Sequence, residues 1–398
     1  MLASRQPSQT SVRRDAWVEV DLAAIENNVR VVLSWLQPGV ELMAVVKSDA
    51  YGHGALAVSP ILLASGASWL GVASVDEGLQ LRAGNQKVPI LILSPCPFWA
   101  VAQAIEEKLD FTITSASQIK DLAAVAGGLG KQARVHLKVD TGMHRLGAKP
   151  SQVAEIVDSI VANPSLEFVG VFSHLAAADD DKTTERQNLL FQSMLTSDIG
   201  SVLSHKLIHL ASGEAARRFP QTHYDLARVG LYLYGLEPKS ISKVVTPALS
   251  VRARICHLQD IDPAAAVGYN LTWTAQKPSR IASIPIGYAD GVDRRLSNRM
   301  KGLLMGQEIS QVGLMSMDQM LFDVTSLPQC QVGDVITLIG TDNTQSESPP
   351  GKGPATLHLA SWASMLDTIT YELACRLRVR LPRIYTRGKS APGQSASA

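Results

Sequence analysis

Between residues 41 and 230 the chain alternates short apolar runs with longer amphipathic stretches. The apolar runs are mostly β-branched or leucine-rich, which is typical of strands buried on both faces of a parallel sheet. There are eight: 41–48, 69–74, 88–94, 110–115, 133–140, 166–174, 205–212 and 224–230. The stretches between them have helical spacing and predict helices at 54–65, 75–82, 98–108, 117–126, 151–161 and 183–195. Eight strand–helix units predict an α/β fold, a (β/α)8 TIM-type barrel, with a doubly wound open sheet as the alternative.

A polar or charged side chain stands at or near the carboxyl end of each apolar run. These residues are Lys47, Ser74, Ser94, Thr114, Asp140, His174, Ser212 and Arg228. In a barrel the carboxyl ends of all strands meet at one mouth, and that mouth holds the active site of enzymes with this fold. The barrel interpretation therefore predicts that these side chains converge, whereas an open sheet does not require it.

The pattern changes after residue 248, where short alternating runs are separated by turns containing Gly and Pro. This pattern predicts a C-terminal, mostly β domain over 248–387, following a barrel domain over 15–247. Within the first domain, 17–22 is interpreted as an extra strand that precedes the barrel, and 21–36 as its helix. Three stretches are too poor in apolar residues to pack and are expected to be flexible or disordered: the lead-in 1–14, the insertion 341–356 and the tail 388–398.

Composition narrows the classes of function. Lys and Arg total 37 against 36 for Asp and Glu, and the net charge of +1 argues against nucleic acid or an anionic membrane as partner. The four cysteines are far apart with no CxxC pair, which argues against a disulfide framework or a metal site and favours the reducing cytoplasm. No apolar run approaches the roughly 20 residues of a membrane helix. The N-terminus lacks the apolar core of a secretory signal and fits a disordered lead-in better than a transit peptide.

Common nucleotide and zinc-protease signatures are absent, since no G-x-G-x-x-G follows a strand and there is no H-E-x-x-H. The informative segment is AVVKSDAYGHG, residues 44–54. A lysine at the end of a buried strand is costly to desolvate, and Lys47 is suited to forming a Schiff base with a carbonyl compound. A lysine that extends to solvent at the barrel rim is the alternative. The loop from Tyr51 to Gly54 combines polar side chains with glycines that let a ligand approach closely.

This segment resembles the lysine motif of the alanine racemases, which use pyridoxal 5'-phosphate (PLP). The resemblance continues in the family's order through HLKVDTGMHRLG, FSHLAAAD, DLARVGLYLYGL, VGYN, IPIGYADG, SMDQM and TITYE, and covers residues 16–383. It implies a homodimeric isomerase, built from a PLP-binding barrel and a β domain, with composite active sites. The implied reaction interconverts L- and D-alanine and supplies D-alanine for the peptidoglycan of the cell wall.

The resemblance assigns the two catalytic bases. Lys47 carries the cofactor and serves one face of the substrate carbon, while Tyr269 of VGYN serves the other face from the partner subunit. Tyrosine is a weak base at its usual pKa of roughly 10, so Tyr269 needs local help to ionise. Taken alone, Tyr269 would be interpreted as a surface aromatic of the β domain.

The resemblance also implies the residues that bind the cofactor. They are Lys47, Tyr51, His174, Ser212, Arg228, Gly230, Leu231 and Tyr371. Arg228 would hydrogen-bond the pyridine nitrogen, and because a guanidinium keeps its protons, the ring remains a weak electron sink that disfavours transamination. The alternative for Arg228 is a rim arginine paired with Asp225 or Asp290, and the alternative for His174 is a satisfied core histidine.

By the same resemblance, Arg145 is expected to contact the substrate carboxylate and the phenolic oxygen of the cofactor. The pocket and its entry channel would be closed from the partner subunit by Tyr288, Met317 and Asp318. Lys138 would support Arg145 either as a carbamate, which turns a buried cation into an anion, or unmodified and bound to Asp140. Two positions depart from the family pattern. Ala211 replaces the more usual Asn, and His144 replaces a smaller residue and would crowd its loop.

Three rival functions are kept open. A related barrel-plus-β decarboxylase would need a cysteine in its site, and Cys330 and Cys375 lie in no such context. A racemase for serine or for a broader set of amino acids differs only in a few pocket residues. A single-domain barrel that carries PLP without catalysis would lack the second domain and Tyr269.

Overall fold

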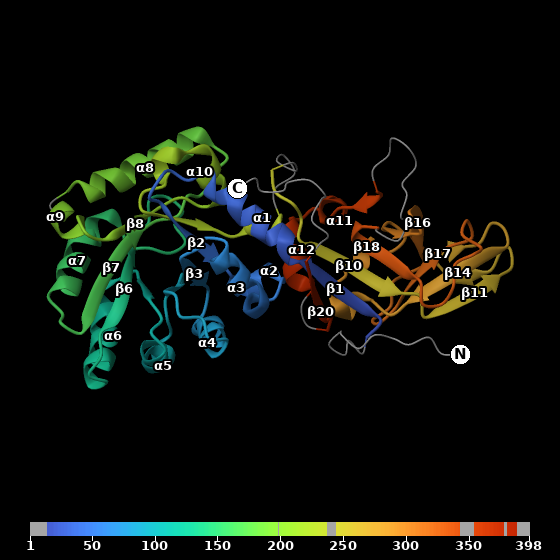
Figure 1. Cartoon of the computed structure of the whole chain (residues 1–398), viewed down its shortest axis with the longest axis horizontal. Helices are drawn as coiled ribbons and strands as arrows, with labels where there is room; N and C mark the ends of the chain where they lie inside the picture. Colours follow the sequence, from blue (N-terminus) through green and yellow to red (C-terminus); the bar gives the residue numbers. More distant parts are fainter. Residues whose placement is uncertain (1–13, 198, 237–243, 343–353, 378–379, 388–398) are drawn as a thin grey trace, which may run out of the picture. The chain divides into compact units, whose positions relative to one another are not determined.

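The computed structural model describes residues 14–197, 199–236, 244–342, 354–377 and 380–387. The described residues form two compact units. The barrel unit holds 23–236 and 244–246, and the β unit holds 14–22 and the described residues from 247 onward. Figure 1 labels many of the helices and strands of both units.

Eight parallel strands form the wall of the barrel unit, and each predicted apolar run contains one of them. They are β2 (Glu41–Val45), β3 (Trp69–Val72), β4 (Ile90–Ile92), β5 (Phe111–Ile113), β6 (Ala133–Lys138), β7 (Leu166–Phe172), β8 (Leu207–His209) and β9 (Leu226–Val229). Pairing gives two arcs, β4-β3-β2-β9 and β5-β6-β7-β8. Parallel bridges between Leu91 and Asp110 and between Ser212 and Arg228 join the arcs, so the sheet closes. The predicted barrel is confirmed, and the open-sheet alternative is wrong.

Helices follow strands at the six predicted positions. They are α3 (Ala55–Ala64), α4 (Val75–Ala83), α5 (Val101–Glu106), α6 (Ala116–Gly128), α7 (Val153–Val161) and α8 (Asp181–Leu195). Figure 1 shows α4 to α8 on the outside of the strands. Two of them begin at side-chain caps, because Ser74 accepts the backbone N–H of Glu77 (3.3 Å) and Asp180 accepts that of Thr183 (2.7 Å). The other helices of this unit include α1 (Leu22–Leu33), α2 (Lys47–Tyr51), α9 (Gly200–Leu203) and α10 (Gly213–Arg218).

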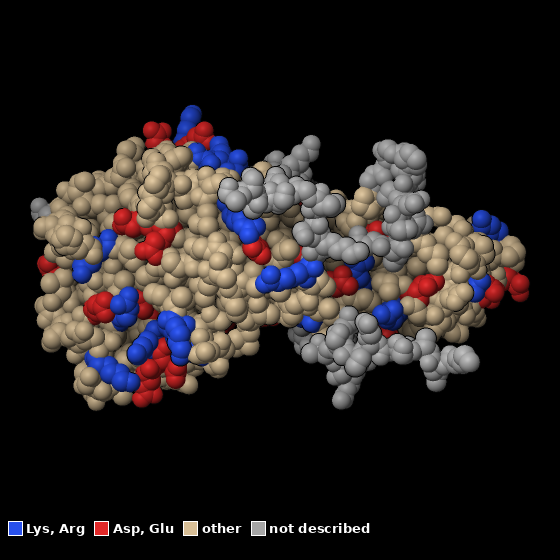
Figure 2. Space-filling model, in the orientation of Figure 1, with Lys and Arg blue, Asp and Glu red and all other residues tan. Residues whose placement is uncertain are grey.

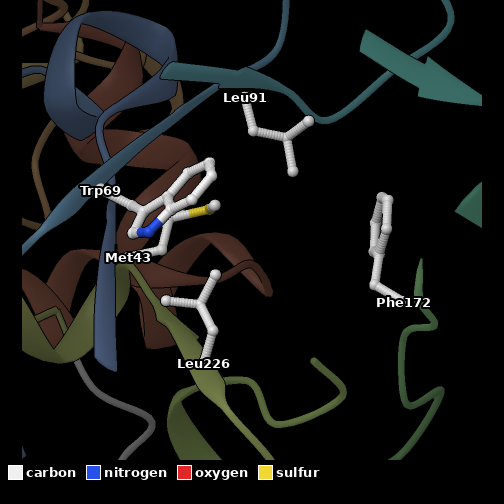
Figure 3. Packing of buried hydrophobic residues seen from close by; sticks show 5 residues of the cluster. All are labelled: Met43, Trp69, Leu91, Phe172 and Leu226. Atoms are coloured by element: carbon white, nitrogen blue, oxygen red, sulfur yellow. The ribbon is translucent and has the colours of Figure 1, made fainter. Parts of the chain in front are cut away.

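Large apolar side chains from several strands pack the barrel interior. Figure 3 shows Met43, Trp69, Leu91, Phe172 and Leu226 around a common centre, and none is more than 5% exposed. Burial of one such side chain contributes about 1.5–3 kcal/mol. Alternate residues of a strand share a face. Arg228, two positions beyond Leu226 on β9, therefore points into the same interior. The apolar core and the polar groups of the mouth therefore occupy one continuous space.

The β unit contains a ten-stranded sheet. The path of this sheet is β11-β14-β17-β16-β15-β18-β10-β1-β20, with β19 paired to β18. The strands are β1 (Ala16–Asp21), β10 (Leu249–Arg254), β11 (His257–Ile261), β14 (Ser279–Ile284), β15 (Lys301–Leu304), β16 (Gln307–Val312), β17 (Met320–Asp323), β18 (Val335–Thr341), β19 (Thr356–Leu357) and β20 (Arg383–Thr386). A hairpin of β12 (Ala266–Val267) and β13 (Trp273–Thr274) stands apart from this sheet. The mostly β prediction is confirmed, with two unpredicted helices, α11 (Leu359–Leu366) and α12 (Thr370–Arg376).

The structure differs from the sequence interpretation at three places. Strand β1 pairs with β10 and β20, so it belongs to the sheet of the β unit, although the expected boundary at residue 15 assigns it to the barrel. Thr341 and Thr356, the ends of the expected insertion, pair with each other, while residues 343–353 lie outside the described residues. Most of the lead-in and the tail 388–398 lie outside them too, but Arg14 forms an ion pair with Asp290 (2.5 Å). Backbone pairing and a buried carboxylate fix segments that composition alone marks as flexible.

Charges of both signs are mixed on the surface. Figure 2 shows Lys and Arg side chains interspersed with Asp and Glu on the visible face. No helix among the described residues is long and apolar enough to span a bilayer.

Candidate active site

Lys47 lies two residues beyond strand β2, at the first position of the short helix α2. The turn that it begins is unusual, because Ser48, Asp49, Ala50 and Tyr51 all have φ of 54°, in the left-handed region. Each such residue costs roughly 1–2 kcal/mol relative to the right-handed conformation. A strained backbone of this kind persists only where surrounding contacts hold it, and it is typical of functional sites.

Two carboxylates hold this left-handed turn. One oxygen of Glu77, on α4, accepts the backbone N–H of Ser48 (2.7 Å), and the other accepts that of Ala73 (2.8 Å). The side chain of Asp49 accepts the backbone N–H of Ala55 (2.7 Å) at the start of α3. Hydrogen bonds to an ionised acceptor are about twice as strong as neutral ones. The direction in which the turn presents its side chains therefore depends on Glu77, which the sequence pattern does not single out.

The predicted phosphate ligands of the barrel unit lie at the ends of neighbouring elements. The backbone of Gly230 approaches Tyr51 so closely that a Cβ atom at position 230 would stand 2.7 Å from the Tyr51 hydroxyl oxygen. Gly230 directly precedes the 3-10 helix η4 (Leu231–Tyr234), and Ser212 directly precedes α10. Ser212 also forms the bridge that joins β8 to β9. Hydroxyls and backbone amides at the first turn of a helix suit a phosphate dianion.

The Arg228 guanidinium is anchored inside the barrel mouth. Its Nη1 donates to the carbonyl oxygen of His209 (2.9 Å) and to Nδ1 of the same residue (3.0 Å). Its Nη2 donates to the carbonyl oxygens of Ser173 (2.6 Å) and Leu210 (3.1 Å) and lies 3.4 Å from Nδ1 of His174. Among the described residues, only the Nε–H of this guanidinium has no acceptor. A pyridine nitrogen is an acceptor that fits this donor.

The alternative pairings of Arg228 are not found. The carboxylate of Asp225 accepts the backbone N–H of Ile208 (2.7 Å), in β8. Asp290 belongs to the β unit, where it pairs with Arg14. Arg228 is therefore a guanidinium held by neutral acceptors, which leaves its positive charge for a ligand.

Four cations shift the pKa values of groups at the mouth. Burial, followed by the charges of Arg228, Arg145 and Lys47, lowers the pKa of Lys138 to about 8. Burial, followed by the charges of the same three residues and of Lys138, lowers the pKa of His174 to about 3. His174 is therefore neutral at physiological pH, and it lies against Arg228 as an acceptor. The mouth carries excess positive charge that an anionic ligand would neutralise.

Asp140 anchors the loop that follows β6. One carboxylate oxygen accepts three successive backbone N–H groups, from Gly142 (3.0 Å), Met143 (3.1 Å) and His144 (3.0 Å). The other lies 3.0 Å from Nδ1 of His144, whose side chain is 82% exposed. His144 therefore points to solvent and does not crowd the loop as expected. Asp140 pairs with His144 in the described chain, whereas the alternative from the sequence pairs it with Lys138.

The predicted base Tyr269 and the predicted pocket residues Tyr288 and Met317 lie on or beside the segment 314–317 of the β unit. Tyr269 forms an antiparallel bridge with Leu314. The backbone N–H of Tyr288 donates to the carbonyl oxygen of Ser316 (3.1 Å), the residue before Met317. The side chains of Tyr269 and Met317 are 66% and 53% exposed. Large exposed aromatic and sulfur-containing side chains are typical of a binding surface.

An ion-pair network extends from this group. Asp318 pairs with Arg380 (2.6 Å), whose guanidinium also lies 3.6 Å from Asp290. Asp290 in turn pairs with Arg14. Arg380, which the sequence pattern does not indicate, therefore fixes the Asp318 carboxylate. Tyr371, the remaining predicted phosphate ligand, lies on α12 of the same unit.

Known proteins resemble this chain over almost its whole length. The family model for the alanine racemase N-terminal domain matches residues 20–238, and the model for the alanine racemase C-terminal domain matches 248–385. An alanine racemase of Synechocystis is 40% identical over 382 residues, which cover 94% of this chain and 99% of the relative. One of Nostoc is 38% identical, with 96% and 99% covered.

Solved structures agree with these relatives. The alanine racemase of Clostridium difficile 630 superposes with a TM-score of 0.86 at 28% identity, covering 96% of this chain and 97% of that one. The Bacillus anthracis enzyme, solved with bound L-Ala-P, has a TM-score of 0.85 at 31% identity, with 94% and 96% covered. Since both family models match in order on a chain that has the closed barrel, the β unit and the strand-end lysine, the protein belongs to the alanine racemase family.

Proposed function

We propose that this protein interconverts L- and D-alanine with PLP bound at the mouth of the barrel unit. One observation carries the proposal: the charges of Lys47, Arg145 and Arg228 all act on buried Lys138 and lower its pKa, so four cationic side chains gather near the strand end that bears Lys47. A phosphate dianion and a substrate carboxylate are the compensating charges that such a site needs. The relatives, which are named alanine racemases, support alanine as the substrate.

When bound, PLP supplies an electron sink that acidifies the α-hydrogen of the amino acid joined to it. Lys47 would hold the cofactor through its amine, and the Nε–H of Arg228 would donate to the pyridine nitrogen, with His174 beside the ring. The phosphate would be bound by Tyr51, Ser212, Tyr371 and the backbone amides of Gly230 and Leu231. Because a guanidinium keeps its protons, Arg228 would bind the ring nitrogen without protonating it, which would keep the cofactor a weak electron sink and disfavour transamination.

Two bases would act on opposite faces of that carbon. Lys47 would take and return the proton on the D-face, and Tyr269 on the L-face. Tyr269 would come from the second subunit of a homodimer, and its high exposure leaves it available to another chain. Arg145 would bind the substrate carboxylate. Tyr288, Met317 and Asp318 of the second subunit would close the pocket over the methyl group.

Lys138 is the proposed site of carbamylation. Its pKa of about 8 leaves a substantial neutral fraction at physiological pH, and the neutral amine is the form that attacks carbon dioxide. The reaction forms a nitrogen–carbon bond, releases one proton and leaves a carbamate anion. That anion would pair with Arg145 and remove one positive charge from the mouth.

The test compares wild-type protein with Lys47→Ala and with a control, Lys182→Ala, on the exposed face of α8. Wild type and control should be yellow and should racemise both enantiomers of alanine, as followed by optical rotation. Lys47→Ala should lose the colour and the racemisation. Serine is assayed in parallel to define the substrate range. A Lys47→Ala protein that racemises alanine at the wild-type rate would refute the assignment.

We also expect the protein to act in the cytoplasm, where its widely spaced cysteines stay reduced.

A further inference from the structure

A chain of buried polar side chains runs from Arg228 through the barrel interior. Nη1 of Arg228 is 3.0 Å from Nδ1 of His209, and Nε2 of His209 is 3.1 Å from Nδ1 of His136. Nε2 of His136 is 3.3 Å from a carboxylate oxygen of Asp110. Asp110 precedes β5, His136 lies within β6 and Arg228 near the end of β9. The chain therefore spans the barrel from the amino ends of the strands to the mouth.

The two histidines between Arg228 and Asp110 can carry their ring protons in only one arrangement. Arg228 can only donate, so Nδ1 of His209 must be an unprotonated acceptor. Nε2 of His209 then carries the proton and donates to Nδ1 of His136, which must be unprotonated in turn. Nε2 of His136 donates to Asp110. All three hydrogen bonds point the same way, from the guanidinium to the carboxylate, and such aligned bonds polarise one another.

The surroundings isolate this chain from water. Asp110, His136 and His209 are at most 1% exposed, and Arg228 is 5% exposed. The ring of His209 stacks on Phe172, with centroids 4.7 Å apart, and the edge of Trp69 meets His136. Both aromatic residues belong to the apolar centre shown in Figure 3. In so apolar a setting a carboxylate at one end and a guanidinium at the other influence each other more than they would in water.

We propose that Asp110, His136 and His209 are positioning residues that set the donor strength of the Arg228 Nε–H; this rests on the proposed function. The negative charge of Asp110, transmitted through two neutral imidazoles, makes the guanidinium a weaker acid. A weaker Nε–H leaves the pyridine nitrogen less positive, so electrons withdrawn from the α-carbon return there. Loss of the charge would strengthen the sink and favour transamination, in which alanine and PLP become pyruvate and pyridoxamine phosphate.

The decisive variant is Asp110→Asn, which keeps the shape and one acceptor oxygen but removes the charge. The matched control is Glu167→Gln. Glu167 pairs with Arg134 (2.6 Å) at the surface, and Arg134 also binds Asp110 (3.0 Å). The control therefore alters the neighbouring ion pair but keeps the hydrogen bonds from Arg228 to Asp110. The PLP-loaded proteins are incubated with D-alanine. Pyruvate formed per racemisation turnover and the absorption spectrum of the cofactor are measured.

In Asp110→Asn we expect pyruvate per turnover to rise by about fivefold or more, the low end of coupling between separated groups. Its cofactor spectrum should shift, whereas Glu167→Gln should match wild type in both measurements. The proposal would be overturned if folded Asp110→Asn and Glu167→Gln formed the same amount of pyruvate per racemisation turnover and had the same cofactor spectrum. A wild-type protein that neither binds PLP nor racemises alanine would instead refute the proposed function.

A second measurement uses the wild-type protein and needs no variant. In wild-type holoenzyme labelled with 15N-histidine, NMR chemical shifts report which imidazole nitrogen carries the proton. We expect His136 and His209 both to be protonated only at Nε2. A proton on Nδ1 of either residue would overturn the proposal, because the bonds could not then all point toward Asp110.

Discussion

Glu77 tests whether the left-handed turn beyond Lys47 is held by its neighbours. The Glu77→Ala variant removes the acceptor of two backbone N–H groups, those of Ser48 and Ala73. At about 1.5 kcal/mol for each charge-assisted bond, the free energy of unfolding should fall by about 3 kcal/mol. For a unit of this size that loss corresponds to a thermal midpoint lower by about 6–12 °C. Since Lys47 and Tyr51 lie at the two ends of the turn, the apparent Kd for PLP should rise more than about tenfold.

The control is Asp76→Ala, in the same first turn of α4, where the carboxylate is exposed. Both variants lose one negative charge near a helix N-terminus, an effect of about 0.3–1 kcal/mol. Only Glu77→Ala also frees the turn. Unfolding in guanidinium chloride, followed by circular dichroism, gives the stability, and cofactor fluorescence gives the Kd. If the two variants agree within about 1 kcal/mol and bind PLP equally, the turn does not depend on Glu77 and the reasoning is wrong.

Three further predictions follow from the proposed chemistry and the charge at the mouth. In deuterated water, Tyr269→Phe should exchange the α-hydrogen of D-alanine faster than it inverts it, while L-alanine keeps its hydrogen; equal slowing for both enantiomers would make Tyr269 a positioning residue. Mixing Lys47→Ala with Tyr269→Ala under subunit exchange should restore activity up to about one intact site per heterodimer, and no recovery after proven exchange would place both bases on one chain. The unfolding free energy should fall as pH drops from about 6.5 towards 3, because unfolded His174 binds a proton that the folded protein excludes down to about pH 3. Urea titrations of His174→Gln should show a shallower loss over that range, and an unchanged slope would contradict the lowered pKa.

The barrel could be predicted because its strands are buried on both faces. Such strands are continuous apolar runs, and the helices between them carry an apolar stripe, so both periods are visible in the sequence. The β unit was harder to predict in detail. Helices α11 and α12 are only 8 and 7 residues long, which leaves little periodicity to detect. The place of β1 depends on pairing with residues 249–253, far along the chain, and no local pattern encodes that partner.

Some features of the candidate site could be predicted from the sequence, and others could not. The positions of Lys47 and Arg228 at strand ends follow from the apolar runs that they terminate. The left-handed conformation of Ser48 to Tyr51 does not, because residues with a Cβ disfavour it, and sequence reasoning assigns such a stretch to ordinary loop or helix. Glu77 looks like a first-turn helix acid until its partners across the loop are known. The one signal available for His136 and His209 is a polar residue inside an apolar run.

The polar chain inside the barrel also bears on how the fold finds its register. Its three hydrogen bonds join residues on or beside β5, β6, β8 and β9, so all four segments must be aligned before any bond can form. A slip of one residue in β6 would turn His136 outward and leave a carboxylate and an imidazole buried without partners. Apolar interiors accept many near-equivalent packings, whereas this interior penalises each misaligned one by the cost of an unmatched buried polar group. The same groups that serve the arginine thus select one strand alignment among the competitors that hydrophobic burial alone would tolerate.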